Sequence, residues 1–153
     1  MHIKCLRGVR LEPARSFGQP GADSSANYKK WNRGFALLHL DWYKNVDGSW
    51  CRFDAVEPGL LQGAGVFVIW KNGSGVKVSA VLYVGRGLLR DEYLRCRRDP
   101  LFYRSESLYV TWTTVSTPLV DAVAAYLYQN LRPLWGEVAP PVSPTPVNLP
   151  VGA

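Results

Sequence analysis

Two apolar segments separated by a short glycine-containing turn place the strongest constraint on how this chain can fold. The first, GVFVIW at 65–70, is a run of β-branched and aromatic residues, and the second is VKVSAVLYVG at 76–85. The intervening KNGSG at 71–75 has the composition of a flexible turn. Together these segments predict a β-hairpin, around which the rest of the domain has to be arranged.

The segments on either side of this hairpin predict another hairpin, a third core strand and two helices. The N-terminal hairpin is predicted from the alternating segments 35–43 and 49–56 around the turn signal NVDG. A short amphipathic helix is expected at 88–98, a strand at 108–115 and a second helix at 119–131. This order predicts a small α+β domain with a central antiparallel or mixed sheet flanked by helices and an extra N-terminal hairpin.

Proline residues mark where the two helices begin and end. Asp99-Pro100 is expected to end the first helix, because the residue before a proline is disfavoured in the helical conformation. Thr117 is predicted to be the N-cap of the second helix, with Pro118 in its first position, and Pro133 is predicted to end it.

Length and composition predict one domain with a tail at each end. A chain of 153 residues suits a single domain, and its hydrophobic fraction of 47% excludes wholesale disorder. Residues 1–33 are predicted to be a weakly ordered basic arm, 34–137 the folded domain and 138–153 a proline-rich extended tail. That tail is either a segment that docks on a protein partner or a strap along the body, because Val147 and Leu149 alternate.

Several classes of protein are excluded by what the sequence lacks. No stretch approaches the roughly 20 apolar residues that cross a bilayer, and the N-terminal residues do not have the pattern of a secretory signal. The cysteines Cys5, Cys51 and Cys96 form no CxxC pair, which argues against a structural zinc site. Reduced thiols in a cytoplasmic protein, with no metal or other cofactor, are therefore expected.

Positive charge is concentrated in two segments of the chain. Residues 1–34 hold seven Lys/Arg against two Asp/Glu, and residues 85–104 hold six against three. Basic segments attract phosphate backbones by releasing counterions, so DNA or another nucleic acid is the predicted partner. The alternative is an ordinary solvated helix face. The predicted contacts are Arg86, Arg90, Arg95, Arg97, Arg98 and Lys71.

Two triplets and a helix end occur in an informative order. Gly65-Val66-Phe67 is followed by Tyr83-Val84-Gly85 and, after a helix, a strand and a second helix, by Leu131-Arg132-Pro133. This set resembles the GIY-YIG nuclease family over residues 63–150. The resemblance implies an endonuclease site that uses Mg²⁺ or Mn²⁺. In such a site a tyrosine on the first strand helps to activate water, an arginine stabilises charge on the phosphate, and a glutamate holds the metal.

Most of the residues that the resemblance implies are replaced in this chain. Phe67 stands where the first tyrosine belongs, Glu92 where the arginine is expected, and Ala124 where the metal-binding glutamate belongs. Tyr83 keeps its position. The neighbouring residues that offer substitutes are Arg86, Arg90 and Arg95 for the arginine, and Asp121, Glu106 and Glu137 for the glutamate.

These replacements predict a degenerate nuclease fold that binds nucleic acid without cutting it. One alternative is an active metal-dependent DNA endonuclease that uses Tyr83 with a displaced arginine and carboxylate. Another alternative is a protein-interaction subunit or decoy, in which the proline-rich tail contacts the partner.

Overall fold

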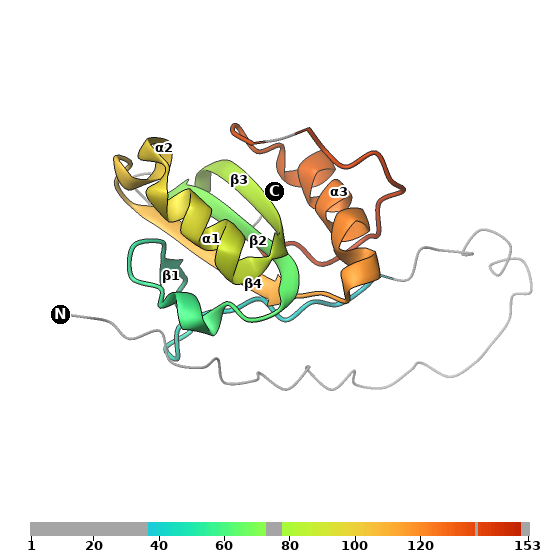
Figure 1. The fold of residues 1–153 in the computed structure, drawn as a ribbon, viewed down its shortest axis with the longest axis horizontal. Helices are drawn as coiled ribbons and strands as arrows, with labels where there is room; N and C mark the ends of the chain where they lie inside the picture. The colour runs from blue at the N-terminus through green and yellow to red at the C-terminus, as the bar shows by residue number, and fades with distance from the viewer. Residues whose placement is uncertain (1–36, 73–77, 137, 151–153) are drawn as a thin grey trace, which may run out of the picture.

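A four-stranded antiparallel sheet forms the centre of the domain, with its strands in the order β1-β4-β2-β3 (Figure 1). The computed structural model describes residues 37–72, 78–136 and 138–150. The elements are β1 (Cys51–Arg52), β2 (Ala64–Asn72), β3 (Val78–Leu88), α1 (Leu89–Arg98), α2 (Pro100–Tyr103), β4 (Leu108–Thr114) and α3 (Val120–Leu131). Among these helices, none has the length and apolar character needed to span a membrane. The predicted α+β class is confirmed, with an antiparallel rather than a mixed sheet.

The central hairpin forms from β2 and β3, as predicted. Phe67 lies opposite Gly85 in this ladder. On its other side β2 pairs with β4, which places Trp112 opposite Phe67 as well. Residues 73–75 of the predicted turn and 76–77 of the predicted second strand lie outside the described residues. The strand β2 is therefore central and buried, which explains why its sequence is a nearly continuous apolar run.

The prediction of an N-terminal hairpin from 35–43 and 49–56 is wrong. Its turn does form, because the Asn45 N–H donates to the Ser49 carbonyl oxygen at 2.8 Å. The described part of 35–43, however, contains one isolated bridge and no strand, and 49–56 contributes only the two residues of β1. The alternating pattern in these segments reflects packing against the sheet and not a ladder between the two arms.

Both arms of this turn bind β4 instead of each other. The Tyr43 N–H donates to the Trp112 carbonyl oxygen at 3.0 Å, and the Tyr43 carbonyl oxygen accepts from the Thr111 hydroxyl at 2.7 Å. β1 pairs with the same strand at Val110 and Tyr109. The edge of β4 presents backbone groups that need partners, and it takes them from both arms.

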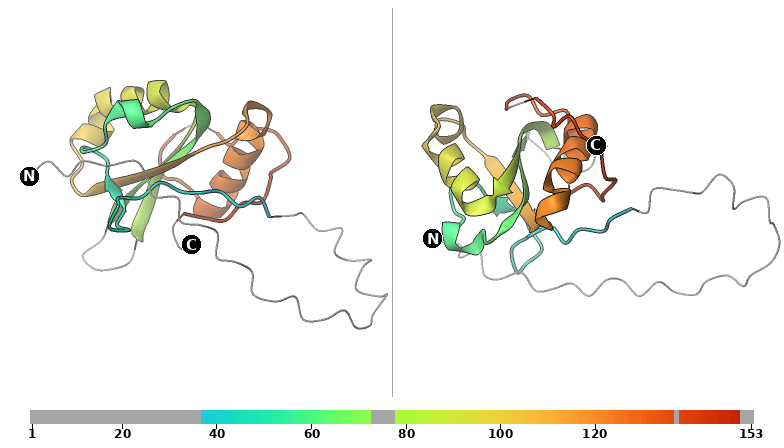
Figure 2. Two further views of the ribbon diagram at one scale, coloured as in Figure 1. Left: turned by 90° about the horizontal axis from the view of Figure 1, so that it is seen from below. Right: turned by 45° about the vertical axis from the view of Figure 1, so that its right-hand side comes forward.

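Alternation along β2 divides the core into two layers on opposite faces of the sheet. Phe67 and Ile69 join one apolar cluster, and Val66, Val68 and Trp70 join the other. The helices α1 and α2 cover the first face, called the α1 face below, and α3 covers the second, called the α3 face (Figure 2). The position of a side chain along a strand therefore decides which helix it can reach.

The helices α1 and α3 lie close to their predicted ranges, but their ends differ in detail. The Asp99 carboxylate accepts from the Leu101 N–H at 2.9 Å and so caps α2, which is too short to show a helical period in the sequence. Thr117 is not the N-cap of α3. Instead, Thr117–Leu119 form one turn of 3₁₀ helix, because the Leu119 N–H donates to the Ser116 carbonyl oxygen.

The C-terminal residues pack along the body as a strap. The Leu38 N–H donates to the Pro146 carbonyl oxygen at 2.9 Å, and Leu38 forms a parallel bridge with Val147, which is 1% exposed. The Asn148 side chain binds both backbone groups of Leu40, accepting from its N–H at 2.6 Å and donating to its carbonyl oxygen at 3.0 Å. Of the two interpretations of the proline-rich tail, the strap is the one observed for the described residues.

Candidate nucleic-acid interface

Tyr83 presents its hydroxyl group at the α1 face. It lies on β3, and only 7% of the residue is exposed. Its hydroxyl oxygen accepts a hydrogen bond from Nη2 of Arg95 at 2.7 Å. Burial, more than any nearby charge, raises the pKa of Tyr83 to about 12. The phenol is therefore neutral at physiological pH and acts as a hydrogen-bonding group.

Arg95 lies between Tyr83 and Glu92. Its Nη2 donates to Oε2 of Glu92 at 2.8 Å, while the arginine side chain stays 56% exposed. Glu92 lies one helical turn earlier on α1, and its side chain is 30% exposed. The hydrogen bond to Glu92 is the main cause that raises the pKa of Arg95. The result is a permanently positive group that is held at two points and is otherwise open to solvent.

The helix brings Arg95, and not Glu92, to the tyrosine hydroxyl. The count along the chain placed Glu92 at the arginine position and left Arg95 among its substitutes. The buried stripe of α1 packs on the sheet, and the two side chains lie together beside that stripe. The carboxylate of Glu92 is therefore engaged by the guanidinium group.

Phe67 lies beside Tyr83 on the same face but offers no polar atom. The two ring centroids are 5.8 Å apart, and Phe67 is fully buried. Gly85 is required opposite Phe67, because a Cβ atom there would come within 2.1 Å of the Phe67 ring. The position that the resemblance gives to a tyrosine is thus filled by a packed ring without a hydroxyl group.

Ala124 is not brought to this site. It is fully buried on the α3 face, in the cluster that contains Val66 and Val68. Phe67 and Tyr83 belong to the cluster on the α1 face. The physical reason is that α3 packs on the face formed by Val66 and Val68, whereas Phe67 points to the other side of the sheet. The positions predicted from the resemblance are therefore split by the sheet.

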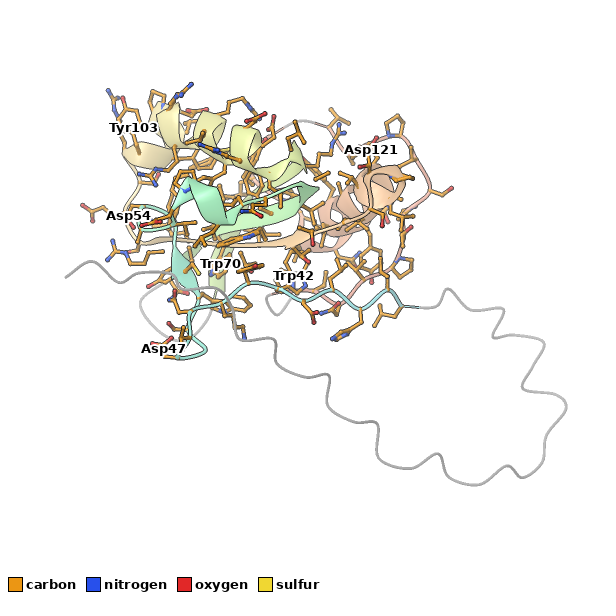
Figure 3. All side chains as sticks on the ribbon, turned by 60° about the horizontal axis from the view of Figure 1, so that its bottom comes forward. Trp42, Asp47, Asp54, Trp70, Tyr103 and Asp121 are labelled. Carbon is orange, nitrogen blue, oxygen red and sulfur yellow. The ribbon has the colours of Figure 1, made fainter. Side chains whose placement is uncertain are left out.

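The residues predicted to contact nucleic acid do not share one surface. Arg86 forms an ion pair with Asp121 of α3, and Asp121 lies at the opposite end of the molecule from Tyr103 (Figure 3). Lys71 is exposed near the end of β2. The contacts predicted from the charge of the sequence are thus distributed over several parts of the fold.

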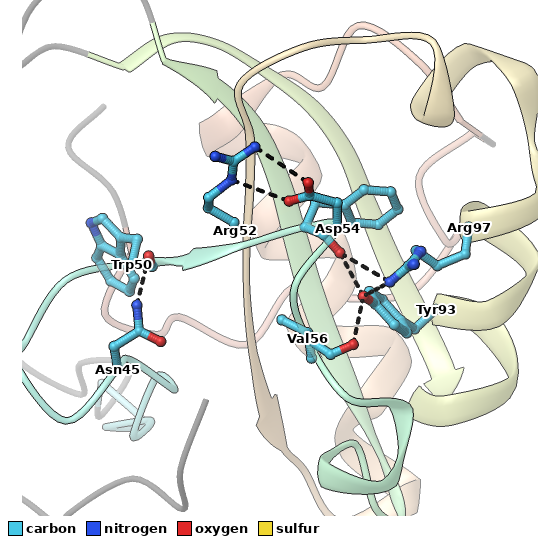
Figure 4. Close-up of polar contacts among 8 residues, drawn as sticks. Asn45, Trp50, Arg52, Asp54, Val56, Tyr93 and Arg97 are labelled. Atoms are coloured by element: carbon cyan, nitrogen blue, oxygen red, sulfur yellow. Dashed lines mark hydrogen bonds and ion pairs between the residues drawn. The ribbon is translucent and has the colours of Figure 1, made fainter. Parts of the chain in front are cut away.

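Arg97 belongs to the internal scaffold. Its Nη1 donates to the Tyr93 hydroxyl oxygen at 2.9 Å, and that hydroxyl donates to the Phe53 carbonyl oxygen at 2.6 Å (Figure 4). The guanidinium group also lies over the rings of Phe53 and Tyr93, 5.9 and 5.8 Å from their centroids. These contacts attach the loop after β1 to α1.

Arg90, Arg95 and Arg98 are the exposed basic residues of α1. All three project from the solvent side of the helix, because its buried stripe consists of other residues. This set of three is called the α1 arginine surface below. It is smaller than the predicted basic face, yet it contains the arginine that contacts Tyr83.

Two further residues, which the sequence motifs do not indicate, lie beside Tyr83. Gly136 has a φ of 120°, and a Cβ atom there would come within 2.9 Å of the Tyr83 ring and 3.3 Å of the Tyr128 hydroxyl oxygen. The Trp135 N–H donates to a carbonyl oxygen of β3 at 2.7 Å and holds this loop against the strand. The only signal in the sequence is the glycine itself, shortly after the end of the last helix.

Ligands for a metal ion are scarce around the tyrosine. Within the ranges that the structure describes, no three His, Cys, Asp or Glu side chains are close enough to hold a metal together. Glu92 is paired with Arg95. Burial raises the pKa of the Cys96 thiol to about 12, so it stays protonated and is a poor ligand at neutral pH.

Comparison with known proteins identifies no relative of this chain. No family model, no curated protein and no solved structure matches it.

Proposed function

We propose that this protein has a GIY-YIG-type nuclease fold and binds nucleic acid without cutting it. The arrangement of the two triplets supports the proposal, because they lie on neighbouring antiparallel strands with Phe67 directly opposite Gly85. The helix α1 follows the second triplet, as the resemblance implies. The predicted strand and the predicted second helix are also present, as β4 and α3.

The observation that carries the binding function is the position of Arg95. Its guanidinium group is held by Tyr83 and Glu92 and exposed on its outer side, between Arg90 and Arg98 along α1. A planar guanidinium fork suits phosphate oxygens, and contacts to phosphate position a nucleic acid without reading its sequence. Binding is therefore expected to be largely independent of sequence and to weaken steeply with salt.

The absence of cutting follows from two side chains. Phe67 has no hydroxyl group with which to help activate water, and it is fully buried. Ala124 has no atom that binds a metal ion, and it lies on the opposite side of the sheet from Tyr83. What the site retains is a neutral phenol and a positive guanidinium group that suit a phosphate, while the Glu92 carboxylate beside them is engaged by Arg95.

Fluorescence anisotropy with a labelled duplex tests the proposal. Arg95→Gln should weaken binding several-fold and make its salt dependence shallower, because one phosphate contact is lost. Arg86→Gln is the matched control, since it removes the same charge from a residue that Asp121 holds beside α3. Equal affinity of the wild type and Arg95→Gln would contradict the assigned surface. No binding even at low salt would contradict the function.

An active endonuclease is a second candidate, because the Arg95–Tyr83 contact supplies a displaced arginine and Glu92 supplies a carboxylate beside it. A denaturing gel of labelled DNA incubated with Mg²⁺ or Mn²⁺ separates the two functions. Intact DNA at saturating protein supports the binding protein. Metal-dependent products that disappear with Tyr83→Phe would support the enzyme.

A further inference from the structure

A hollow of about 450 Å³ opens beside α2, between the loop after β1 and the residues that precede β4. Asp54 and Tyr103, two of its lining residues, lie at the same end of the molecule (Figure 3). Phe102 also lines the hollow, and its ring contacts Tyr83 edge-on with the centroids 5.6 Å apart. The hollow therefore lies one aromatic ring away from the site that holds Arg95.

Three aromatic side chains line it. Phe53 and Phe102 are buried, with ring centroids 5.7 Å apart. Tyr103, on the short helix α2, is 58% exposed. The guanidinium group of Arg104 lies 5.8 Å from the Tyr103 ring centroid. A flat exposed ring with a positive group beside it offers a stacking surface.

Both hydrogen-bond donors and acceptors line the same hollow. Arg52 holds the Asp54 carboxylate at 3.2 and 3.3 Å, and Arg97 contributes a second guanidinium group. Glu106 is exposed, and none of the described residues donates a hydrogen bond to its carboxylate. The site is thus suited neither to a purely apolar molecule nor to a simple anion, because charges of both signs surround it.

The wall next to β4 is held in a strained conformation. Ser107 has a φ of 58°, in the left-handed region that few residues other than glycine adopt. Its carbonyl oxygen accepts from the Asn72 N–H at 3.4 Å, which ties the wall to the end of β2. Residues in such conformations are enriched at sites where ligands bind.

We propose that this hollow takes one unpaired nucleobase. A base has a flat face that stacks on Tyr103, exocyclic amino groups that donate to Glu106, and ring acceptors for a guanidinium group. The volume lies in the range of small-ligand sites. For a base within a strand, the inference rests on the proposed function, in which the α1 arginine surface holds the backbone. The same chemistry also admits a free nucleotide.

Two probes and one pair of variants test the inference. The probes are a paired duplex and the same duplex with one bulged nucleotide, and binding of nucleoside monophosphates is followed separately by NMR. The wild type should prefer the bulged duplex by about fivefold or more, as expected for one stacked base. Tyr103→Ala should abolish that preference. Leu101→Ala is the control, because Leu101 is equally exposed on α2 but does not line the hollow.

The outcomes separate this inference from the proposed function. Equal binding of the two duplexes, with no binding of monophosphates, would overturn the nucleobase site and leave the phosphate-binding function intact. Binding of monophosphates that Tyr103→Ala abolishes, without binding of either duplex, would support the site and overturn the proposed function. Absence of all binding would overturn both. Circular dichroism spectra identical to the wild type ensure that each variant is folded.

Discussion

Under the proposed function, the ion pair between Glu92 and Arg95 is expected to weaken the binding of nucleic acid. The same nitrogen, Nη2 of Arg95, donates to Oε2 of Glu92 at 2.8 Å and to the Tyr83 hydroxyl at 2.7 Å. A phosphate that binds Arg95 must compete with this carboxylate. Glu92→Gln removes the competing charge, and the amide oxygen is still able to accept a hydrogen bond. The substitution is therefore expected to strengthen binding.

The expected gain is set by the exposure of the pair. The side chains of Arg95 and Glu92 are 56% and 30% exposed, so solvent screens their attraction. An ion pair at the surface contributes about 0.2–1 kcal/mol. If binding of a phosphate replaces the pair, removing the charge of Glu92 raises the affinity by about 1.4- to fivefold. The gain should shrink as salt is added, because the interaction is electrostatic.

The assay is anisotropy with a labelled duplex, and Asp91→Asn is the matched control. Asp91 neighbours Glu92 in the first turn of α1, so both substitutions remove one negative charge and disturb the helix dipole alike. Among the described residues, only the Glu92 carboxylate is paired with Arg95. A gain for Glu92→Gln well above the gain for Asp91→Asn is the expected result.

Two results would refute this reasoning. Equal gains for the two variants would mean that only the net charge of the helix matters and that Glu92 does not compete for Arg95. Weaker binding by Glu92→Gln would mean that the carboxylate orients the guanidinium group for the ligand. Both variants should keep the thermal stability of the wild type to within a few degrees, because each removes one surface carboxylate.

Three further predictions concern stability. Ala124→Glu should lower the free energy of unfolding by about 3 kcal/mol or more, because its carboxylate would be buried on the α3 face. Ala122 is only partly buried on the same helix, so Ala122→Glu should lower this free energy far less when both variants are compared by chemical denaturation. Asn148→Ala should cost about 1–3 kcal/mol and increase hydrogen exchange in residues 38–42, since two hydrogen bonds to the backbone are lost. The exposed Asn130→Ala is its control, and equal exchange in both variants would contradict the strap as an anchor. The wild type should lose stability between pH 10 and about pH 12, because the Tyr83 phenol ionises near pH 10 in the unfolded chain and near pH 12 in the folded one. In denaturation curves, Tyr83→Phe should lack this part of the loss, which amounts to up to about 2 kcal/mol. A pH profile of Tyr83→Phe identical to that of the wild type would contradict this prediction.

Local patterns in the sequence were sufficient for most of the central elements. The apolar runs at 65–70 and 76–85 predicted the hairpin of β2 and β3, and the spacing of apolar residues predicted α1 and α3. These predictions succeed because strand alternation and helical period are properties of neighbouring residues. The N-terminal hairpin failed for the opposite reason, since the partner of both arms is β4, far along the chain.

At the candidate site, too, the sequence indicated single residues but not which of them come into contact. The triplet with Tyr83 is visible in the sequence. Counting along the chain gives Glu92 the arginine position, and the structure shows that Arg95 is the residue that contacts the Tyr83 hydroxyl. A helix turns by about 100° per residue, so an offset of a few positions decides which side chain reaches the strand. No count along the chain indicates how Gly136 approaches the tyrosine ring.

The sequence by itself therefore determined the class of fold, the central hairpin, the helices α1 and α3, and the place of Tyr83 in the second triplet. Only the tertiary structure decided which groups meet. It placed Ala124 behind the sheet, paired Arg86 with Asp121, turned Arg97 inward and left Arg95 on the surface beside Tyr83. The reason is that the face of a sheet and the rotation of a helix are set by packing between distant segments, which no local pattern contains.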